Sequence, residues 1–166
     1  MSTPLLTLNA ELELVNEAGK KRVVSLKDFI TGPSKTLLKN DEILRTIIVS
    51  KWKNKKIKTD YERYSTRNQM DIALASVSVL LEFDEGKKAI KNANIALGGV
   101  SPTPIRLPEK LERKLENITL TEDNIAKISE EAAMICNPSG RRTPADYRRQ
   151  VISILIKRIL TDMRNI

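Results

Sequence analysis

Residues 71–97 read DIALASVSVLLEFDEGKKAIKNANIAL, and this stretch decides the fold. Residues 71–83 place small and apolar side chains in loose alternation, and residues 88–97 return with a similar composition. Residues 84–86 are Asp, Glu and Gly, which are typical of turns, so the stretch predicts two antiparallel strands joined by a turn. An extended segment at residues 58–65 precedes them, and the three segments together predict an antiparallel meander.

The segments before the meander predict a β-hairpin arm. Residues 10–17 (AELELVNE) alternate apolar and polar side chains, and residues 20–26 resume this extended character after an Ala-Gly pair. Residues 27–31 predict one helical turn that ends at a Gly-Pro pair. Residues 41–49 are rich in β-branched side chains and predict a connecting strand.

The chain becomes helical after Pro108. Leu111 and Leu115 are four residues apart, and Thr121 predicts the N-cap of a longer helix. The apolar faces expected for this helix and for the closing helix are Ile125, Ile128, Ala132 and Ile135, and Ile152, Leu155, Ile156, Ile159 and Met163. We therefore expect an α+β fold. It has an antiparallel sheet of three to four strands with the C-terminal helices on one face, preceded by the β-hairpin arm.

The side-chain inventory excludes several kinds of site. The 166 residues contain no histidine and one cysteine, Cys136, which excludes histidine-based triads, internal disulfides and cysteine-built metal sites. Cys136 lies in an apolar helical run and is expected to be a small buried hydrophobe. No apolar stretch approaches the roughly 20 residues that span a bilayer. The N-terminus does not resemble a secretory signal, so we expect a cytoplasmic protein with no membrane partner.

The formal net charge of +8 raises nucleic acid as a partner. Residues 51–58 (KWKNKKIK) combine five lysines with Trp52, an arrangement that a single-strand binder would use. The alternative is a solvated loop or edge strand whose lysines discourage pairing with other strands. We favour the alternative because the other cations are scattered among acids, and we do not expect nucleic acid as a partner.

Four segments in fixed order carry a more specific interpretation. They are residues 29–44 (FITGPSKTLLKNDEIL), 61–72 (YERYSTRNQMDI), 94–106 (NIALGGVSPTPIR) and 141–149 (RRTPADYRR). They resemble, in the same order, four patterns in the later part of the FAD-binding (medium) subunit of the xanthine dehydrogenase and carbon monoxide dehydrogenase family of molybdenum hydroxylases. The resemblance runs from about Leu5 to about Leu160, which is nearly the whole chain.

This resemblance implies a role in electron transfer within an assembly. Members of the family hydroxylate their substrate at molybdenum and pass electrons through iron–sulfur clusters to FAD and then to an acceptor such as NAD. The expected partners are an iron–sulfur subunit, a molybdopterin subunit and a chain carrying the N-terminal FAD loops. FAD would be shared with that missing portion, and molybdopterin and the clusters would lie only in partner subunits. Residues 1–50 are then the remnant of the FAD-binding domain, and residues 57–166 are a C-terminal domain of the CO dehydrogenase flavoprotein type.

The resemblance also assigns three residues to the cofactor. Leu44, beside Ile43, matches the position whose backbone and side chain lie against the flavin. Arg63 matches a family lysine near the flavin ring. This difference keeps the positive charge but replaces a compact ammonium with a planar guanidinium. Arg63 as an ordinary surface cation is the alternative. We expect no catalytic or metal-binding residue, because the cofactor supplies the redox chemistry and the protein its placement.

Three functions are therefore weighed. The first is part of a multi-subunit oxidoreductase that is not active alone, and the isolated chain is expected to bind FAD weakly or not at all. The second is an assembly module without redox duty, which docks partner subunits through the sheet face or the closing helices. The third is a basic nucleic-acid binder that works through residues 51–58.

Overall fold

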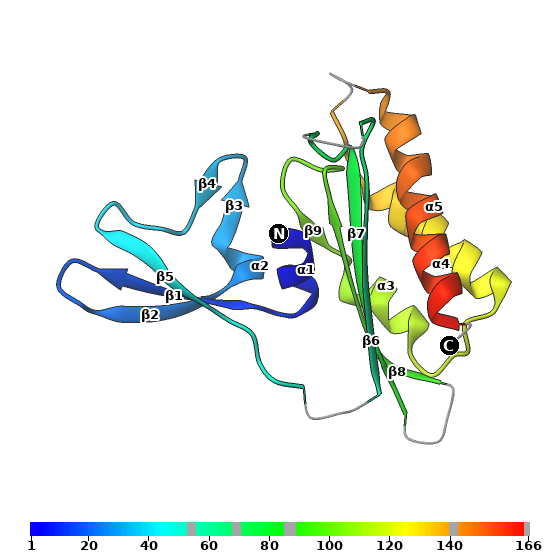
Figure 1. The fold of residues 1–166 in the computed structure, drawn as a ribbon, viewed down its shortest axis with the longest axis horizontal. Coiled ribbons are helices and arrows are strands. Elements are labelled where there is room, and N and C mark those ends of the chain that lie inside the picture. Colours follow the sequence, from blue (N-terminus) through cyan, green and yellow to red (C-terminus); the bar gives the residue numbers. More distant parts are fainter. Residues whose placement is uncertain (53–55, 68–70, 85–88, 140–142, 165–166) are drawn as a thin grey trace.

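The computed structural model describes residues 1–52, 56–67, 71–84, 89–139 and 143–164, which form an arm and a larger body (Figure 1). The elements of the arm are α1 (Ser2–Thr7), β1 (Glu11–Asn16), β2 (Lys21–Ser25), α2 (Leu26–Phe29), β3 (Ile30–Gly32), β4 (Lys35–Thr36) and β5 (Glu42–Ile48). Those of the body are β6 (Ile57–Tyr64), β7 (Ala75–Phe83), β8 (Ile90–Gly98), β9 (Ile105–Arg106), α3 (Glu109–Glu112), the 3-10 helix η1 (Arg113–Leu115), α4 (Glu122–Ile135) and α5 (Ala145–Arg164).

The arm is a small antiparallel sheet in the order β2-β1-β5, which confirms the expected hairpin and connecting strand. Leu12 and Leu14 alternate with exposed or half-buried neighbours along β1 and pack against Leu6 and Leu26 of the two short helices. The helical turn predicted at residues 27–31 is present as α2 but ends at Phe29, and β3 and β4 form a separate two-stranded ribbon that the sequence did not predict. Ser34 lies between them with a φ of 56°, a left-handed conformation that completes the tight connection.

The body is built on a four-stranded antiparallel meander in the order β6-β7-β8-β9. Strand β7 begins four residues later than the sequence pattern suggested. The Asp71 carboxylate accepts hydrogen bonds from the Thr66 hydroxyl (2.8 Å) and the Arg67 amide (3.1 Å), and this loop delays the strand. The predicted turn at residues 84–86 lies largely outside the described residues, but the Asp84 amide donates to the Ala89 carbonyl across it.

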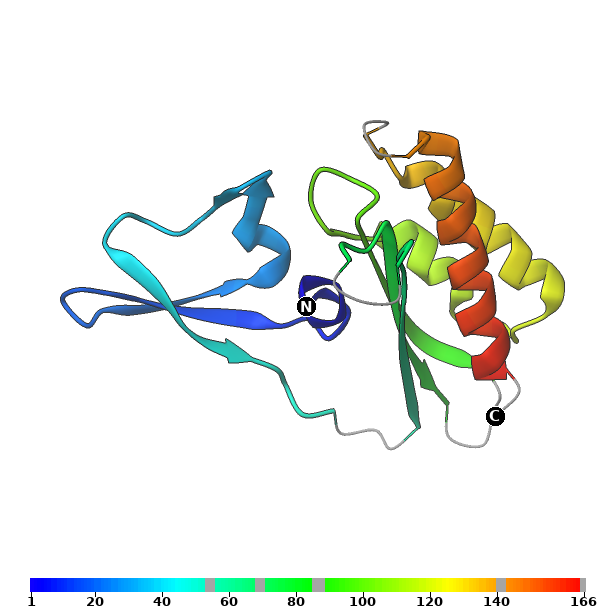
Figure 2. The same ribbon diagram turned by 45° about the horizontal axis from the view of Figure 1, so that its top comes forward.

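The helices of the body cover one face of this sheet, so the α+β class and the placement of the C-terminal helices are confirmed (Figure 2). All five residues expected on the buried face of α5 belong to the main core. Thr121 caps α4 as predicted, because its hydroxyl accepts from the Asn124 amide at 3.3 Å. One expectation was wrong: Ile135 remains 38% exposed, because in the last turn of α4 the main core takes up Ala132 and Ala133 instead.

Helix α1 covers part of the opposite face of the same sheet, and the sequence analysis did not predict it (Figure 2). The Thr3 hydroxyl lies 3.4 Å from the Ser76 hydroxyl, and the Thr7 hydroxyl donates to the Ser78 carbonyl at 3.3 Å. A Cβ atom on Gly98 would lie 2.5 Å from Thr3 Oγ1 and 2.6 Å from Ser76 Oγ. Glycine at this position therefore permits the close approach of α1 to the sheet.

Candidate functional site

Ile43 and Leu44 lie on β5, the last strand of the arm. Within the described part of the chain β5 pairs only with β1, so its other edge has no partner strand. Ile43 is 67% exposed and Leu44 is 43% exposed, and Ile47 and Val49 extend this exposed apolar row along the strand. Leu44 lies opposite Leu14 and Ile43 opposite Val15, so Ile43 and Leu44 point to opposite faces of the arm sheet. An apolar row on an open strand edge is a surface that proteins normally protect or cover.

An arginine–carboxylate pair holds the start of β5 in place. Arg22 Nε and Nη2 donate to the two oxygens of Glu42, each at 2.7 Å, and Glu42 also accepts from the Lys39 amide at 2.9 Å. Arg22 Nη2 reaches the Leu37 carbonyl at 2.7 Å. The hydrogen bond from Arg22, with that from Lys39, lowers the pKa of Glu42 to about 2. The pair therefore ties β2 to the loop before Ile43 and fixes how that side chain is presented.

Arg63 lies on β6, an edge strand of the body sheet, opposite Ser76 of β7. Directly opposed residues point to the same face of a sheet, and Ser76 faces α1, so Arg63 points to that face too. The neighbouring Glu62 points the other way and accepts from Arg158 of α5 at 3.3 Å. Arg63 is exposed, and the described residues give it no ion pair, so its charge is available to a ligand or partner.

The structure does not bring the three assigned residues into contact. Ile43 and Leu44 belong to the arm sheet and Arg63 to the body sheet, and β5 and β6 are well separated in both views (Figures 1 and 2). Sequence reasoning did not single out Tyr61, which shares the face of Arg63 and is 42% exposed. Side chains two residues apart on a strand point to the same face, so the assignment of Arg63 could have indicated Tyr61 as well.

A buried ionic cluster at the junction of arm and body was missed as well. Arg106 donates to Glu112 through Nε (2.6 Å) and Nη2 (2.9 Å), and it also bonds Asn94 and Asn9. Glu112 in turn accepts from the Ile95 amide at 2.8 Å. Because these residues come from the arm, β8, β9 and α3, the cluster serves to lock the two parts together rather than to bind a ligand.

The lysine-rich segment at residues 51–58 is partly used by the fold. Residues 53–55 lie outside the described part, and Trp52 is half-buried. The Lys58 ammonium donates to the Met163 carbonyl at 2.7 Å, near the C-terminus of α5, where a cation stabilises the helix end. At least one of its lysines is therefore structural.

Other classes of site find no support in the described residues. No group of three or more His, Cys, Asp or Glu in that part of the chain is arranged to hold a metal ion. No helix there is both long and apolar enough to cross a bilayer. Cys136 is buried as expected, and this burial raises the pKa of its thiol to about 11.

Comparisons with known proteins identify related sequences for both parts. Residues 61–163 match the family described as the CO dehydrogenase flavoprotein C-terminal domain, and residues 1–52 match the FAD binding domain in molybdopterin dehydrogenase. A xanthine dehydrogenase FAD-binding subunit from Escherichia coli O157:H7 is 28% identical over 97% of this chain and 54% of its own length. A xanthine dehydrogenase/oxidase from Gallus gallus is 26% identical over 98% of this chain and 12% of its own length.

Solved structures agree with these matches. A carbon monoxide dehydrogenase chain from Hydrogenophaga pseudoflava superposes with a TM-score of 0.85 and 26% identity, covering 95% of this chain and 53% of that one. This chain thus spans about half the length of the FAD-binding subunit and of the structural relative it matches.

Proposed function

We propose that this chain, which belongs to the family of CO dehydrogenase flavoprotein C-terminal domains, works as part of the FAD-binding subunit of a xanthine-dehydrogenase-type molybdenum hydroxylase. The two family matches cover the arm and the body, so the resemblance read from the four sequence segments is confirmed. In this role the chain helps to pass electrons from iron–sulfur clusters through FAD to an acceptor such as NAD. It acts within a multi-subunit oxidoreductase and not alone.

The observation that carries the proposal is the exposed apolar row on β5. The resemblance assigns Ile43 and Leu44 to the flavin, and their exposed fractions of 67% and 43% leave apolar surface that a planar ring could cover. Burying such side chains against a ligand is favourable by about 25 cal/mol per Å² of apolar surface. FAD supplies the redox chemistry when it is bound. Because Ile43 and Leu44 point to opposite faces of the arm sheet, one of them would exclude water from the ring.

Arg63 supports the same assignment through its charge. Its exposed guanidinium has no ion-pair partner among the described residues, and Tyr61 lies beside it on the same face. A fixed cation favours negative charge on a nearby ligand, so Arg63 would stabilise electron density on the ring. Because β5 and β6 lie in different sheets, we infer that the cofactor, or the polypeptide that carries it, fills the space between them.

The phosphate end of FAD fits this chain less well. A dinucleotide pyrophosphate is normally cradled by backbone amides in a glycine-rich loop. Residues 1–52 contain two glycines, Gly19 and Gly32, which lie in separate parts of the arm. We infer that another polypeptide segment supplies the pyrophosphate loops and shares FAD with residues 1–50. The open edge of β5 offers it a place to pair by strand addition.

The remaining partners follow from the same role. The relatives are named as FAD-binding subunits, and a subunit implies an assembly. We infer that residues 57–166 face an iron–sulfur subunit and a molybdopterin subunit. The family matches favour this function over the assembly module without redox duty and over the nucleic-acid binder.

Calorimetric titration of FAD tests how the cofactor is shared. The purified chain should bind FAD weakly or not at all. A fusion protein can be made in which the unmatched part of the Escherichia coli FAD-binding subunit precedes Met1 of this chain. This fusion should retain flavin on purification. Submicromolar affinity of the chain alone would overturn the sharing of FAD. A fusion that folds but stays colourless would count against the flavin role itself.

A further inference from the structure

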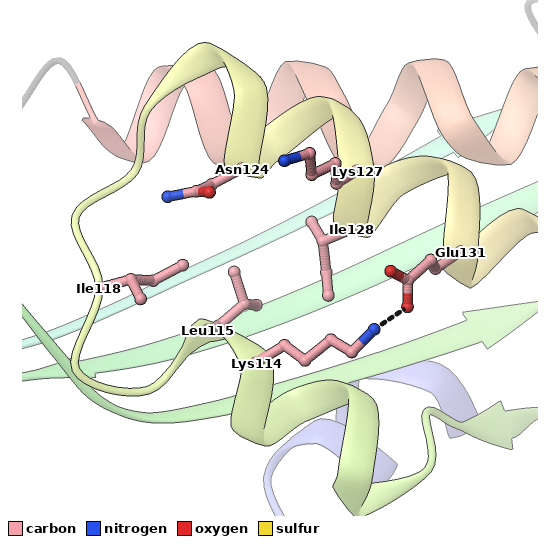
Figure 3. Close-up of a pocket in the computed structure, with 7 residues that line it drawn as sticks. All are labelled: Lys114, Leu115, Ile118, Asn124, Lys127, Ile128 and Glu131. Carbon is pink, nitrogen blue, oxygen red and sulfur yellow. Dashed lines mark hydrogen bonds and ion pairs between the residues drawn. The ribbon is translucent and has the colours of Figure 1, made fainter.

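We propose that the groove between α3–η1 and α4 binds an acidic amphipathic helix of a partner polypeptide. The groove has two hollows, of about 220 Å³ and about 400 Å³. Lys114 and Glu131 line both hollows and form an ion pair at 2.5 Å where the hollows meet (Figure 3). The groove therefore runs along the two helices on both sides of this pair.

The floor of the groove is apolar. Figure 3 shows Leu115, Ile118 and Ile128 directed into the smaller hollow. The larger hollow is lined by Leu111, Met134 and Ile135, and Met134 is 78% exposed. Ile135 is the residue that the sequence pattern had placed in the core. Leu115 and Ile128 are only 0% and 3% exposed and belong to the main core, so the apolar surface that an inserted helix would cover is mainly that of Met134 and Ile135.

The rim of the groove carries excess positive charge. Lys110 borders the larger hollow and Lys127 the smaller one, and the described residues give neither of them an ion pair. Glu131 is the only acid that lines the described hollows, and Lys114 already neutralises it. The two remaining ammonium groups favour carboxylates at the flanks of the occupant.

This groove is separate from the surface assigned to the flavin. Helices α3 and α4 cover one face of the body sheet, whereas α1 and Arg63 lie on the other (Figure 2). An occupant of the groove therefore does not compete with the polypeptide that completes the FAD site. The proposal requires a protein partner, but it does not depend on FAD binding.

Titration of labelled peptides into the full chain tests the proposal. The probe is a fluorescein-labelled amphipathic helix with leucines on one face and glutamates on the other, and its counterpart carries lysines in place of glutamates. We expect the acidic peptide to bind and the basic one to bind at least tenfold more weakly. K110E/K127E should weaken the acidic peptide about fivefold or more, since each reversal removes one exposed charge pair. K20E/K35E on the arm makes the same change in net charge and should leave the affinity unchanged.

A second pair of variants separates the apolar contribution from charge. Met134→Ser should weaken the acidic peptide several-fold, whereas Ile154→Ser, at a position 56% exposed on α5, should not. Amide chemical-shift changes on titration should cluster on residues 108–135. The proposal is overturned if neither peptide binds, if both bind equally, if each groove variant behaves like its control, or if the shifts fall elsewhere.

Discussion

Arg22 holds Glu42 through two hydrogen bonds of 2.7 Å, and this pair sets where β5 begins. The apolar row that we assign to the flavin starts at the next residue, Ile43. The pair therefore connects a part-buried charge interaction of the arm to the start of the proposed cofactor surface.

The Glu42 pair gives the arm a specific dependence on pH. The pKa of Glu42 is lowered to about 2 in the folded chain, so its ionised form stabilises the fold above the unfolded value near 4.5. We expect the free energy of unfolding of the unmodified protein to exceed that of Glu42→Gln at pH 7. The difference should shrink as pH falls from about 5 toward 2. Urea denaturation at several pH values measures this, with Glu17→Gln as a control on the same arm. A difference that stays constant to pH 2 would contradict the expectation.

Removing one partner of the Arg106–Glu112 pair should lower the stability of the protein more than replacing both partners with apolar residues. Both side chains are largely buried, so Arg106→Met leaves the Glu112 carboxylate without its partner and should destabilise the protein by about 3–5 kcal/mol. The double variant Arg106→Met/Glu112→Leu removes both charges and should be more stable than Arg106→Met alone. Chemical denaturation of the three proteins measures this. A double variant that is less stable than the single one would show that the pair acts through packing instead.

The exposed edge of the arm should matter for cofactor retention and not for stability. Ile43→Asp changes a side chain that is mostly in solvent, so the free energy of unfolding should move by no more than about 0.5 kcal/mol. In the FAD-retaining fusion described above, the same change should weaken flavin binding at least tenfold. Val23→Asp, at an exposed site on the other edge strand β2, is the matched control and should retain flavin. Equal flavin loss in both variants would exclude a specific role for β5.

The charge of Arg63 should appear in the flavin reduction potential of the assembled protein. Arg63→Gln removes a cation that favours added negative charge, so the potential should become more negative. An exposed charge interaction of about 0.2–1 kcal/mol corresponds to about 5–20 mV for a two-electron couple. Arg63→Lys should leave the reduction potential nearly unchanged, because the positive charge is retained. An unchanged potential in Arg63→Gln would support the alternative that this residue is an ordinary surface cation.

The strands and long helices could be predicted because their core-facing apolar residues follow the period of each element, although both faces of β7 are buried. Val77, Val79 and Leu81 of β7 all belong to the main core, and the apolar stripe of α5 is buried as the spacing indicated. Period-two and period-3.6 patterns arise when one face of an element packs against a single layer. The flavin assignment of Ile43 and Leu44 depended instead on resemblance, because their exposure cannot be read from an apolar strand pattern.

The parts that the sequence did not reveal depend on contacts between distant residues. Helix α1 has six residues, which is too short to be stable by itself, and its threonines bond Ser76 and Ser78 far along the chain. Ile135 continues an apolar helical pattern, but the last turn of α4 buries Ala132 and Ala133 and leaves Ile135 partly exposed. The partners of Arg106 come from the arm, β8 and α3, and no local spacing indicates such a set.

The docking of α1 also has a consequence for the order of folding. The meander of the body joins neighbouring strands through short connections, so its contacts are local and quick to form. Thr3 and Ser76 are 73 residues apart, and closing so long a loop is slow until the sheet presents its polar face. We therefore expect the amides of β7 and β8 to gain protection from hydrogen exchange before those of α1, with the arm assembling on a finished sheet.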